Sequence, residues 1–222
     1  MKVNSLILNT IAATMVISGA TAGCSSDVPA TDFTASELAL IREVGSRSQD
    51  EPSDIPAGTM RVLTIENDAD LAILRAKSTD LSDAALLSDD YSALCSLMVA
   101  TVTDPSQDGV GIAGPQVGLN RRVVAVQRFD KEGEPFEVYP NIRITWASDS
   151  LEPGPEGCLS VPDRRGDVLR SQEIVIEYTA VEDCGSDAAH LKTVKEAING
   201  FTAVIFQHEV DHLEGILYID RL

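Results

Sequence analysis

The residues best suited to chemistry lie near the end of the chain, where residues 208–212 form the HExxH pattern HEVDH. If this segment is helical, His208 and His212 project from one side, one turn apart. Two ring nitrogens can then bind one divalent ion, while Glu209 lies beside it to handle a proton. A lone histidine on an apolar helix face is usually a core residue, but these are two of only 3 histidines. The pattern therefore predicts a metal site.

A catalytic metal of this kind needs a third protein ligand. Too few residues follow His212 to supply the downstream glutamate of one zincin class, and Tyr218 stands where metzincins place a third histidine. The ligand is therefore expected upstream, with His190, an acidic residue or a cysteine as candidates. Cys158 is favoured because it follows a glycine in a loop and because a thiolate suits Fe(II) or Zn(II). The alternative is that Cys158 is a buried, inert thiol.

Hydrophobic periodicity indicates the elements that must position these groups. Residues 194–214 are expected to form a closing helix that carries Ile198, Phe201, Val204 and both motif histidines on one face and ends near Gly215. Further expected elements are helices at residues 37–44 and 90–103, strands at 122–129, 135–145 and 173–180, and an irregular loop at 152–162. Together they predict an α+β domain of mostly antiparallel sheets packed around the C-terminal helix.

The first residues resemble a targeting signal. Lys2 gives a short positive region, and an apolar stretch at residues 5–20 is shorter than a membrane-spanning helix requires. Small residues then lead to Cys24, as in a bacterial lipobox, whose cysteine is lipidated and becomes the mature N-terminus. Ordinary secretion, an uncleaved anchor or a later start at Met60 are the alternatives.

The expected organisation follows from this signal. A lipoprotein signal peptide covers residues 1–23, a tether with one short helix covers 24–58, and a catalytic domain covers 59–222. We therefore expect a monomer that is exported and lipid-anchored to the membrane, on the periplasmic or outer-membrane side. Such a protein could pair Cys95 with Cys184. Because the first falls on an expected helix and the second in a turn, two unrelated thiols are the preferred interpretation.

The charge balance excludes one class of partner. With 35 acidic against 17 basic residues, the formal net charge is −18. Such a surface repels phosphate backbones, so no nucleic-acid partner is expected. The acidity also serves solubility, which is the simpler explanation for it.

Three segments together resemble the signature segments of the peptide deformylase family. Residues 109–116 (GVGIAGPQ), 156–160 (EGCLS) and 207–213 (QHEVDHL) occur in the family's order, and the similarity covers roughly residues 60–222. One departure is Gly114, where the family usually has an alanine; this change is expected to loosen the loop without removing a functional group.

The resemblance implies a metal-dependent hydrolase that removes the N-formyl group from formyl-methionyl peptides. One divalent ion, commonly Fe(2+) with Zn(2+) or Ni(2+) as alternatives, would be held by Cys158, His208 and His212 with a fourth position open for water. Glu209 would act as the base. The resemblance further implies oxyanion donors at the Gln116 side chain and the Leu159 backbone N–H, and a pair, Glu156 and Arg170, that braces the cysteine loop. For Gln116 the alternative is a turn residue that bonds its own loop, and for the pair it is an ordinary surface ion pair.

Substrate binding is expected in two parts. The backbone of Val110, Gly111 and Ile112 can pair with an extended peptide. Arg165 is placed to meet the peptide backbone or carboxylate, with a solvated side chain as the alternative. Phe201 and Val204 are candidate walls of a methionine pocket, with ordinary core residues as the alternative. Because nascent chains are deformylated in the cytosol, an exported enzyme is expected to act on extracytoplasmic formyl-peptides instead. The rival interpretations are a related metallo-amidase with another acyl substrate and a non-catalytic peptide-binding lipoprotein of the same fold.

Overall fold

The computed structural model describes residues 29–47, 55–182 and 190–222. The expected signal peptide with Cys24, and Cys184 with its turn, lie outside these residues. Cys95, the other cysteine in the pairing that was considered, carries a free thiol. Within the described ranges, no helix combines the length and the apolar character needed to cross a bilayer.

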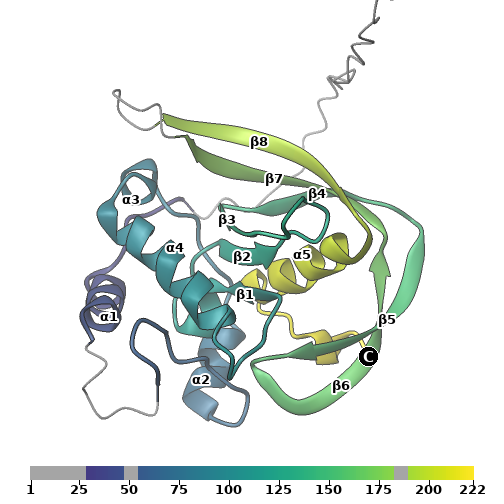
Figure 1. Ribbon diagram of the computed structural model, residues 1–222, viewed down its shortest axis with the longest axis horizontal. Coiled ribbons are helices and arrows are strands. Elements are labelled where there is room, and N and C mark those ends of the chain that lie inside the picture. Colours follow the sequence, from purple (N-terminus) through teal and green to yellow (C-terminus); the bar gives the residue numbers. More distant parts are fainter. Residues whose placement is uncertain (1–28, 48–54, 183–189) are drawn as a thin grey trace, which may run out of the picture.

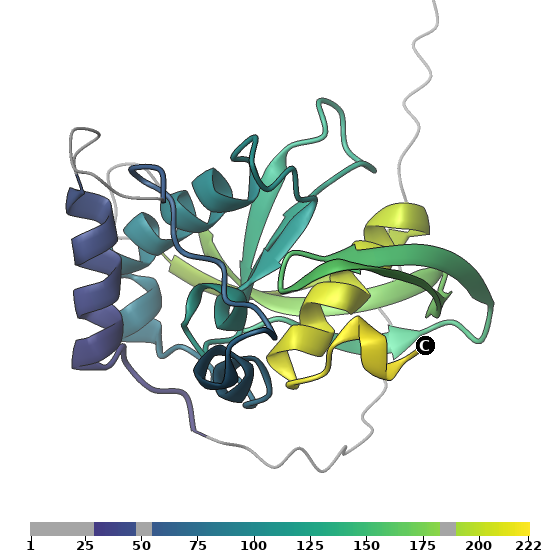
Figure 2. The same ribbon diagram turned by 90° about the horizontal axis from the view of Figure 1, so that it is seen from below.

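The helices of the N-terminal half gather at one side of the molecule, whereas the C-terminal helix lies among the strands (Figures 1 and 2). The α-helices are α1 (Ala35–Ser46), α2 (Asp68–Leu74), α3 (Asp83–Leu86), α4 (Asp89–Val102) and α5 (Gly200–Leu213), with short 3-10 helices at Gly114–Val117 (η1) and Tyr218–Asp220 (η2). Each of the first four α-helices begins after a Thr, Asn or Ser whose side-chain oxygen accepts a backbone N–H of the first turn. Such caps satisfy donors that a helix otherwise leaves unpaired.

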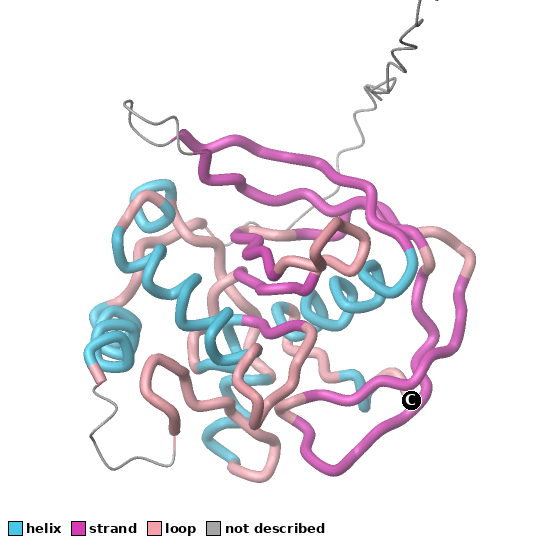
Figure 3. The backbone as a smooth tube through the Cα atoms, in the orientation of Figure 1, coloured by secondary structure: helices cyan, strands magenta, loops and turns pink. Residues whose placement is uncertain are grey.

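The strands form three antiparallel sheets. The order is β1–β2–β3 in the first sheet, β4–β7–β8 in the second and β5–β6 in the third. Their bounds are β1 Gly111–Ala113, β2 Val123–Gln127, β3 Phe136–Pro140, β4 Arg143–Ala147, β5 Leu151–Cys158, β6 Val161–Ser171, β7 Glu173–Glu182 and β8 His190–Asn199. Figure 3 shows the two long hairpins, β5–β6 and β7–β8, curving around α5. The predicted α+β class with antiparallel sheets and a C-terminal helix is therefore confirmed.

The closing helix is shorter than the predicted range of 194–214. Residues up to Asn199 belong to β8, and α5 begins at Gly200, whose φ of +61° turns the chain. Ile198, predicted on the helix face, is a buried strand residue. The apolar spacing of the helix continues back through residues 194–198, although Asn199 and Gly200, which are typical turn residues, mark the boundary.

The segment predicted as an irregular loop at residues 152–162 is instead most of a hairpin. Pro153 and Pro155 are exposed on β5 and pair with Leu169 and Asp167 across the ladder. A two-stranded sheet consists only of edge strands, so a proline can lie where no N–H is required. The predicted single strand at 135–145 is likewise divided, because Asn141, with φ +54°, separates β3 from β4.

Helix α1 is packed into the globular body, although it lies in the segment expected to be a tether. Its Ile41 and Val44 are buried in the same apolar cluster as residues of α4. Arg121 donates through Nε and Nη2 to the Glu37 carboxylate at 2.7 Å each. A second cluster joins α5 to the sheets, and this packing holds the helix in place behind the site.

Candidate metal centre

Helix α5 carries the two histidines and the glutamate of the HExxH motif. The ring centroids of His208 and His212 lie 5.1 Å apart, so both imidazoles are on the same side of the helix. Glu209 and His212 are buried, at 3% and 1% exposed. The helical spacing therefore places two nitrogen ligands and an acid together, as expected from the motif.

The β5–β6 hairpin brings Cys158 to this helix. A register irregularity between Glu156 and Cys158 lies just before the turn. The Cys158 Sγ lies 3.2 Å from His212 Nε2, and the ligand atoms of Cys158, His208 and His212 all lie within 4.8 Å of one another. His190, another ligand candidate, is exposed on β8 and belongs to no such group within the described part of the chain.

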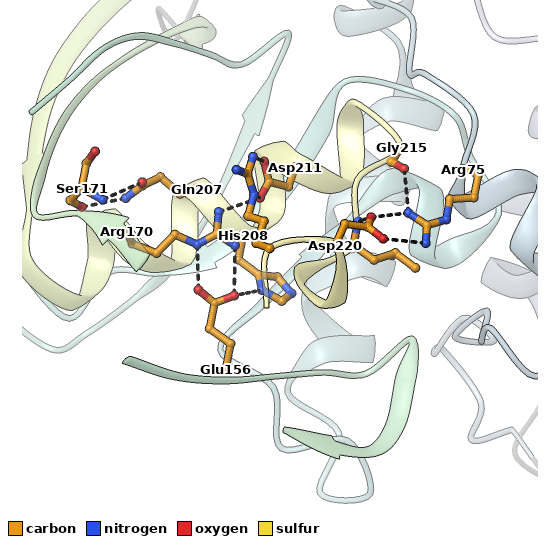
Figure 4. Close-up of polar contacts among 11 residues, drawn as sticks. Arg75, Glu156, Arg170, Ser171, Gln207, His208, Asp211, Gly215 and Asp220 are labelled. Carbon is orange, nitrogen blue, oxygen red and sulfur yellow. Dashed lines mark hydrogen bonds and ion pairs between the residues drawn. The ribbon is translucent and has the colours of Figure 1, made fainter. Parts of the chain in front are cut away.

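A buried chain of charged groups orients His208 (Figure 4). Arg170 donates to both Glu156 oxygens, at 2.7 Å and 3.0 Å, and to Asp211 at 2.6 Å. The Glu156 Oε2 lies 2.8 Å from His208 Nδ1, and Arg221 donates twice to Asp211 at 2.5 Å. Because Nδ1 is bound to Glu156, the Nε2 of His208 is left for a metal, which is the usual arrangement around a metal-bound histidine.

Electrostatics set the protonation states of the ligands. Burial lowers the pKa of His212 well below its ordinary value, so this ring is in the neutral, metal-binding form. Burial also opposes the charge of His208, but hydrogen bonds to Cys158 and Glu156 outweigh it and raise its pKa to about 10. Burial would raise the pKa of Glu156, yet His208 and Arg170 lower it to about 2, which keeps this carboxylate charged.

Glu209 is suited to accept a proton. Its Oε2 is buried without a hydrogen-bond partner among the described residues, and burial raises its pKa to about 7. A general base is most effective when its pKa lies near the working pH. Gly111 makes room for it, because a Cβ there would lie 2.5 Å from Glu209 Oε1.

Gln116 lies in η1 and is 1% exposed. Its Oε1 accepts the Ala113 N–H at 2.8 Å, while its Nε2 lies 3.2 Å from Ser160 Oγ and 3.6 Å from Cys158 Sγ. The two expectations for this residue are therefore both met in geometry: the carbonyl holds its own loop, and the amide donor faces the ligand set. Leu159, the other expected donor, follows Cys158 and lines the same pocket.

A pocket of about 730 Å³ opens over the ligands. Val110, Gly111, Arg165, Phe201 and Val204 line it, as do Gln116, Glu156, Cys158, Leu159, His208 and Glu209. Phe201 is 57% exposed at the rim, where its ring packs on Phe129 with centroids 5.3 Å apart.

Ile112 contributes backbone rather than a pocket wall. Its side chain is fully buried in the apolar cluster with α4, and it does not line the pocket. Its strand, β1, is at one end of the β1–β2–β3 sheet, with β2 on one side only. The sheet therefore presents an edge along which an extended peptide can add as a further strand.

Comparison with known proteins agrees with this geometry. The family described as polypeptide deformylase matches residues 60–222. The chain belongs to this family. Residues 24–58, including α1, precede the matched region.

Relatives in the polypeptide deformylase family match at high coverage. The peptide deformylase of Caulobacter vibrioides is 37% identical over 164 residues, which covers 73% of this chain and 87% of that protein. The peptide deformylase structure from Acinetobacter baumannii has a TM-score of 0.63 at 34% identity and covers 74% of this chain and 99% of that one. The structure from Thermotoga maritima gives a TM-score of 0.60 at 27% identity, covering 74% and 97%.

Family membership makes this chain a formyl-removing hydrolase that uses one catalytic metal. The donor set fits that requirement: a thiol and two imidazoles converge, one ring is held neutral by burial, and a carboxylate fixes the other. Cys158, His208 and His212 are the residues that would hold the ion.

Gly114, the departure from the family's usual alanine, lies in a tightly packed turn. A Cβ at this position would lie 2.7 Å from the backbone oxygens of both Arg121 and Leu119. An alanine would require one of these segments to move. Here the glycine allows the loop with Gln116 to pack against the segment that Arg121 ties to α1.

Four residues at or beside the site, Ser160, Asp211, Arg164 and Arg221, were given no role from the sequence. Ser160 contacts Gln116, Asp211 joins Arg170 to Arg221, and Arg164 lines the pocket beside Arg165. The sequence contains a weak indication for Asp211, because an acidic residue there lies within the HExxH motif, on a helix expected to be largely buried. It contains none for Arg221 and Arg164, since exposed arginines are common on any surface.

Proposed function

We propose that this protein hydrolyses the N-formyl group of formyl-methionyl peptides with one divalent ion on Cys158, His208 and His212. The observation that carries the proposal is the convergence of this ligand set with a buried, unpartnered Glu209 at the base of one pocket. A relative from Acinetobacter baumannii has been solved with Met-Ala-Ser bound, which supports a methionyl peptide as the occupant.

The residues divide the reaction among them. A divalent ion bound here would supply Lewis-acid activation of water. Glu209 takes up the proton of the attacking water and delivers it to the departing amine. The Gln116 amide and the Leu159 N–H donate to the oxygen of the formyl group as its negative charge develops. Glu156 and Arg170 keep His208 oriented throughout.

The pocket has separate places for peptide backbone and side chain. The edge of β1 can pair with the peptide backbone, and Gly111 leaves room for the Glu209 carboxylate beside this strand. Val204 and Phe201, on α5 before His208, supply apolar surface for a methionine side chain.

Location and metal form the finer part of the proposal. We infer that Cys24 is lipidated, that the enzyme is a monomer outside the inner membrane, and that its substrates are formyl-peptides found there. Fe(2+) is the proposed ion, because a thiolate with two imidazoles accommodates it, as it does zinc or nickel. Membrane fractionation with Cys24→Ser as control tests the location; wild-type protein confined to the cytosol would refute it.

The decisive experiment combines metal analysis with an acyl-specific assay. Protein purified under anaerobic conditions should contain about one ion per chain, as expected for a site with three protein ligands. It should cleave formyl-methionyl peptides and leave acetyl-methionyl peptides intact. Equal cleavage of both would identify a broader metallo-amidase, and metal binding without any cleavage would identify a binding protein of this fold.

A further inference from the structure

Residues 29–47, which include α1, precede the region that the family matches, yet they are packed into the catalytic domain. Thr31 pairs with Leu81 in a short parallel bridge. The Thr31 N–H donates to the Asp80 carbonyl oxygen at 3.1 Å, and its own carbonyl oxygen accepts the Ser82 N–H at 3.0 Å. The segment is therefore fixed to the domain at its beginning as well as through the apolar face of α1.

The side chain of Arg121 connects this N-terminal segment to the domain. Arg121 is 3% exposed, and its Nε and Nη2 donate to the two Glu37 oxygens at 2.7 Å each. Its Nη1 donates to Thr31 Oγ1 at 2.6 Å and to Thr79 Oγ1 at 3.1 Å. Its Nη2 also donates to the Asp32 carbonyl oxygen at 2.6 Å. Three of these four acceptor residues belong to the N-terminal segment, so this segment satisfies most of a buried cation that would be costly to leave unpaired.

The backbone of Arg121 lies against the loop that contains η1. A Cβ on Gly114 would lie 2.7 Å from the carbonyl oxygens of both Arg121 and Leu119. The Leu119 N–H in turn donates to the Gly114 carbonyl oxygen at 2.9 Å. Helix α1 contacts the other end of this loop, since a Cβ on Gly118 would lie 3.6 Å from Leu40 Cδ2. Because close-packed interiors transmit strain, a shift of the Arg121 backbone displaces the loop as well.

Gln116 is the residue of this loop that acts in the proposed reaction. It follows Gly114 by two residues, and its Nε2 lies 3.2 Å from Ser160 Oγ and 3.6 Å from Cys158 Sγ. An oxyanion donor is effective only at hydrogen-bond distance from the atom on which charge develops. A misplacement of about 1 Å can cost on the order of 10²-fold in rate. The position of the loop therefore matters for turnover.

We propose that Glu37 and Arg121 are positioning residues through which α1 holds the Gln116 amide where the oxyanion develops. This inference rests on the proposed function and extends the catalytic unit to residues that precede the family match. Neither Glu37 nor Arg121 is among the described residues that line the pocket, so their effect on the reaction is exerted through the loop. The N-terminal segment thus contributes to turnover rather than serving only as a tether.

The test begins with Glu37→Gln in the metal-loaded, full-length protein. Glutamine also serves at this position of a capping box, so the contact with Thr34 at the start of α1 is kept while the charge that pairs with Arg121 is lost. The kcat for formyl-Met-Ala-Ser should fall about three- to tenfold, a part of the 10²–10³ that one oxyanion donor is worth. KM and metal content should stay those of the wild type, because the donor acts in the transition state.

A double-mutant cycle separates positioning from general stabilisation. Gln116→Ala removes the donor itself, so adding Glu37→Gln to it should lower kcat no further. A loss that came from weaker folding would recur at the same size with or without Gln116. Urea unfolding of each variant verifies that it is folded under the conditions of the assay.

The matched control is Asp90→Asn. It makes the same carboxylate-to-amide change in another contact of α1, the exposed pair of Asp90 with Arg42, which does not involve Arg121. This variant also weakens the attachment of α1 to the domain. Its kcat should equal that of the wild type.

Different results would reject different claims. A wild-type kcat in Glu37→Gln, an equal loss in the Gln116→Ala background, or the same loss in Asp90→Asn overturns the positioning role while leaving formyl hydrolysis intact. If the wild-type enzyme cleaves no formyl-peptide, the proposed function itself is wrong and this inference is rejected with it.

Discussion

Two buried arginines, Arg128 and Arg170, make similar ion-pair clusters with different consequences. Arg128 follows β2 and donates to Asp130 at 2.7 Å and 2.8 Å and to Glu196 at 2.6 Å. Arg170 on β6 donates to Glu156 and Asp211 over similar distances. The side chains of both arginines are almost completely buried, at 1% and 4% exposed.

The difference lies in the other contacts of the carboxylates. Glu156 is 6% exposed, and its second contact is a histidine of the metal site. Asp130 and Glu196 are 25% and 28% exposed, and their cluster contacts the Tyr139 hydroxyl rather than a metal ligand. A buried arginine therefore does not mark a functional site by itself. The role of such an arginine depends on which other group hydrogen-bonds to the carboxylate that it holds.

The largest loss of turnover is expected when Glu209, the proposed base in the same site as Arg170, is removed. Glu209→Ala should lower kcat for a formyl-peptide by about 10²–10⁴-fold, because it removes the proton acceptor. The metal content should remain that of the wild type, since Glu209 is not one of the three clustered ligands. Anaerobic turnover assays and metal analysis of the same samples provide the measurement.

A matched control for that variant lies in the Arg128 region. Glu137→Ala also removes one glutamate carboxylate, in this case a partner of Arg128 and Lys131. Its turnover should equal that of the wild type. Unchanged turnover in Glu209→Ala would contradict the base assignment.

The next effect compares the two arginines directly. Arg170→Lys keeps the positive charge but loses the bidentate contact with Glu156. Glu156, and through it His208, is then oriented less firmly. Metal affinity should fall by about 10–100-fold, the usual cost of losing a partner of a metal-bound histidine. Arg128→Lys should lower the free energy of unfolding without changing metal affinity. Competition with a chelating dye for Zn(II) measures both, and equal affinity losses would remove the distinction between the clusters.

A smaller loss of stability is expected for Arg221, which contacts Asp211 at the exposed end of the ion-pair chain through Arg170. Arg221 is 41% exposed where it meets Asp211, so solvent screens much of this interaction. Arg221→Gln should lower the free energy of unfolding by less than about 1 kcal/mol. Its metal affinity should stay near that of the wild type, because Arg170 continues to hold Asp211. A tenfold loss of affinity would show that the chain of charges is coupled over its whole length.

The smallest expected effect is on the pH dependence of the free energy of unfolding, through Asp130 in the Arg128 cluster. Hydrogen bonds from Arg128 lower the pKa of Asp130 below its ordinary value. The unfolded state then binds the proton more readily, so Asp130 contributes stability above an unfolded pKa of about 3.9 and loses it as pH falls through the folded pKa. Urea unfolding of Asp130→Asn should show a deficit at neutral pH that shrinks below about pH 4. A deficit that is constant with pH would refute the ionic origin.

Local signals were sufficient for the motifs and for several elements. The spacing of His208 and His212 predicted a shared helix face because helical periodicity is a property of the chain alone. The capping residues Thr34 and Ser88 likewise lie next to the helices that they cap. The family resemblance covered the region that the family match later confirmed.

Signals failed where tertiary contacts override local preference. The prolines of β5 suggested a loop, but pairing with β6 along an exposed edge makes a strand there. The start of α5 was misplaced because pairing with the preceding strand, β7, keeps the residues up to Asn199 in an extended strand. Strand formation depends on such cross-strand contacts, which the residue pattern of one segment does not contain.

The sequence by itself determined which groups are available: a thiol, two imidazoles four residues apart, a base between them and an acidic surface. Only the tertiary structure decided that Cys158 lies within 3.2 Å of His212 and that Arg170 joins Glu156 to Asp211. These facts depend on where the hairpin crosses the helix. Burial and distance arise only when remote segments pack together, and they convert residue types into ligands, a base and a charged pocket wall.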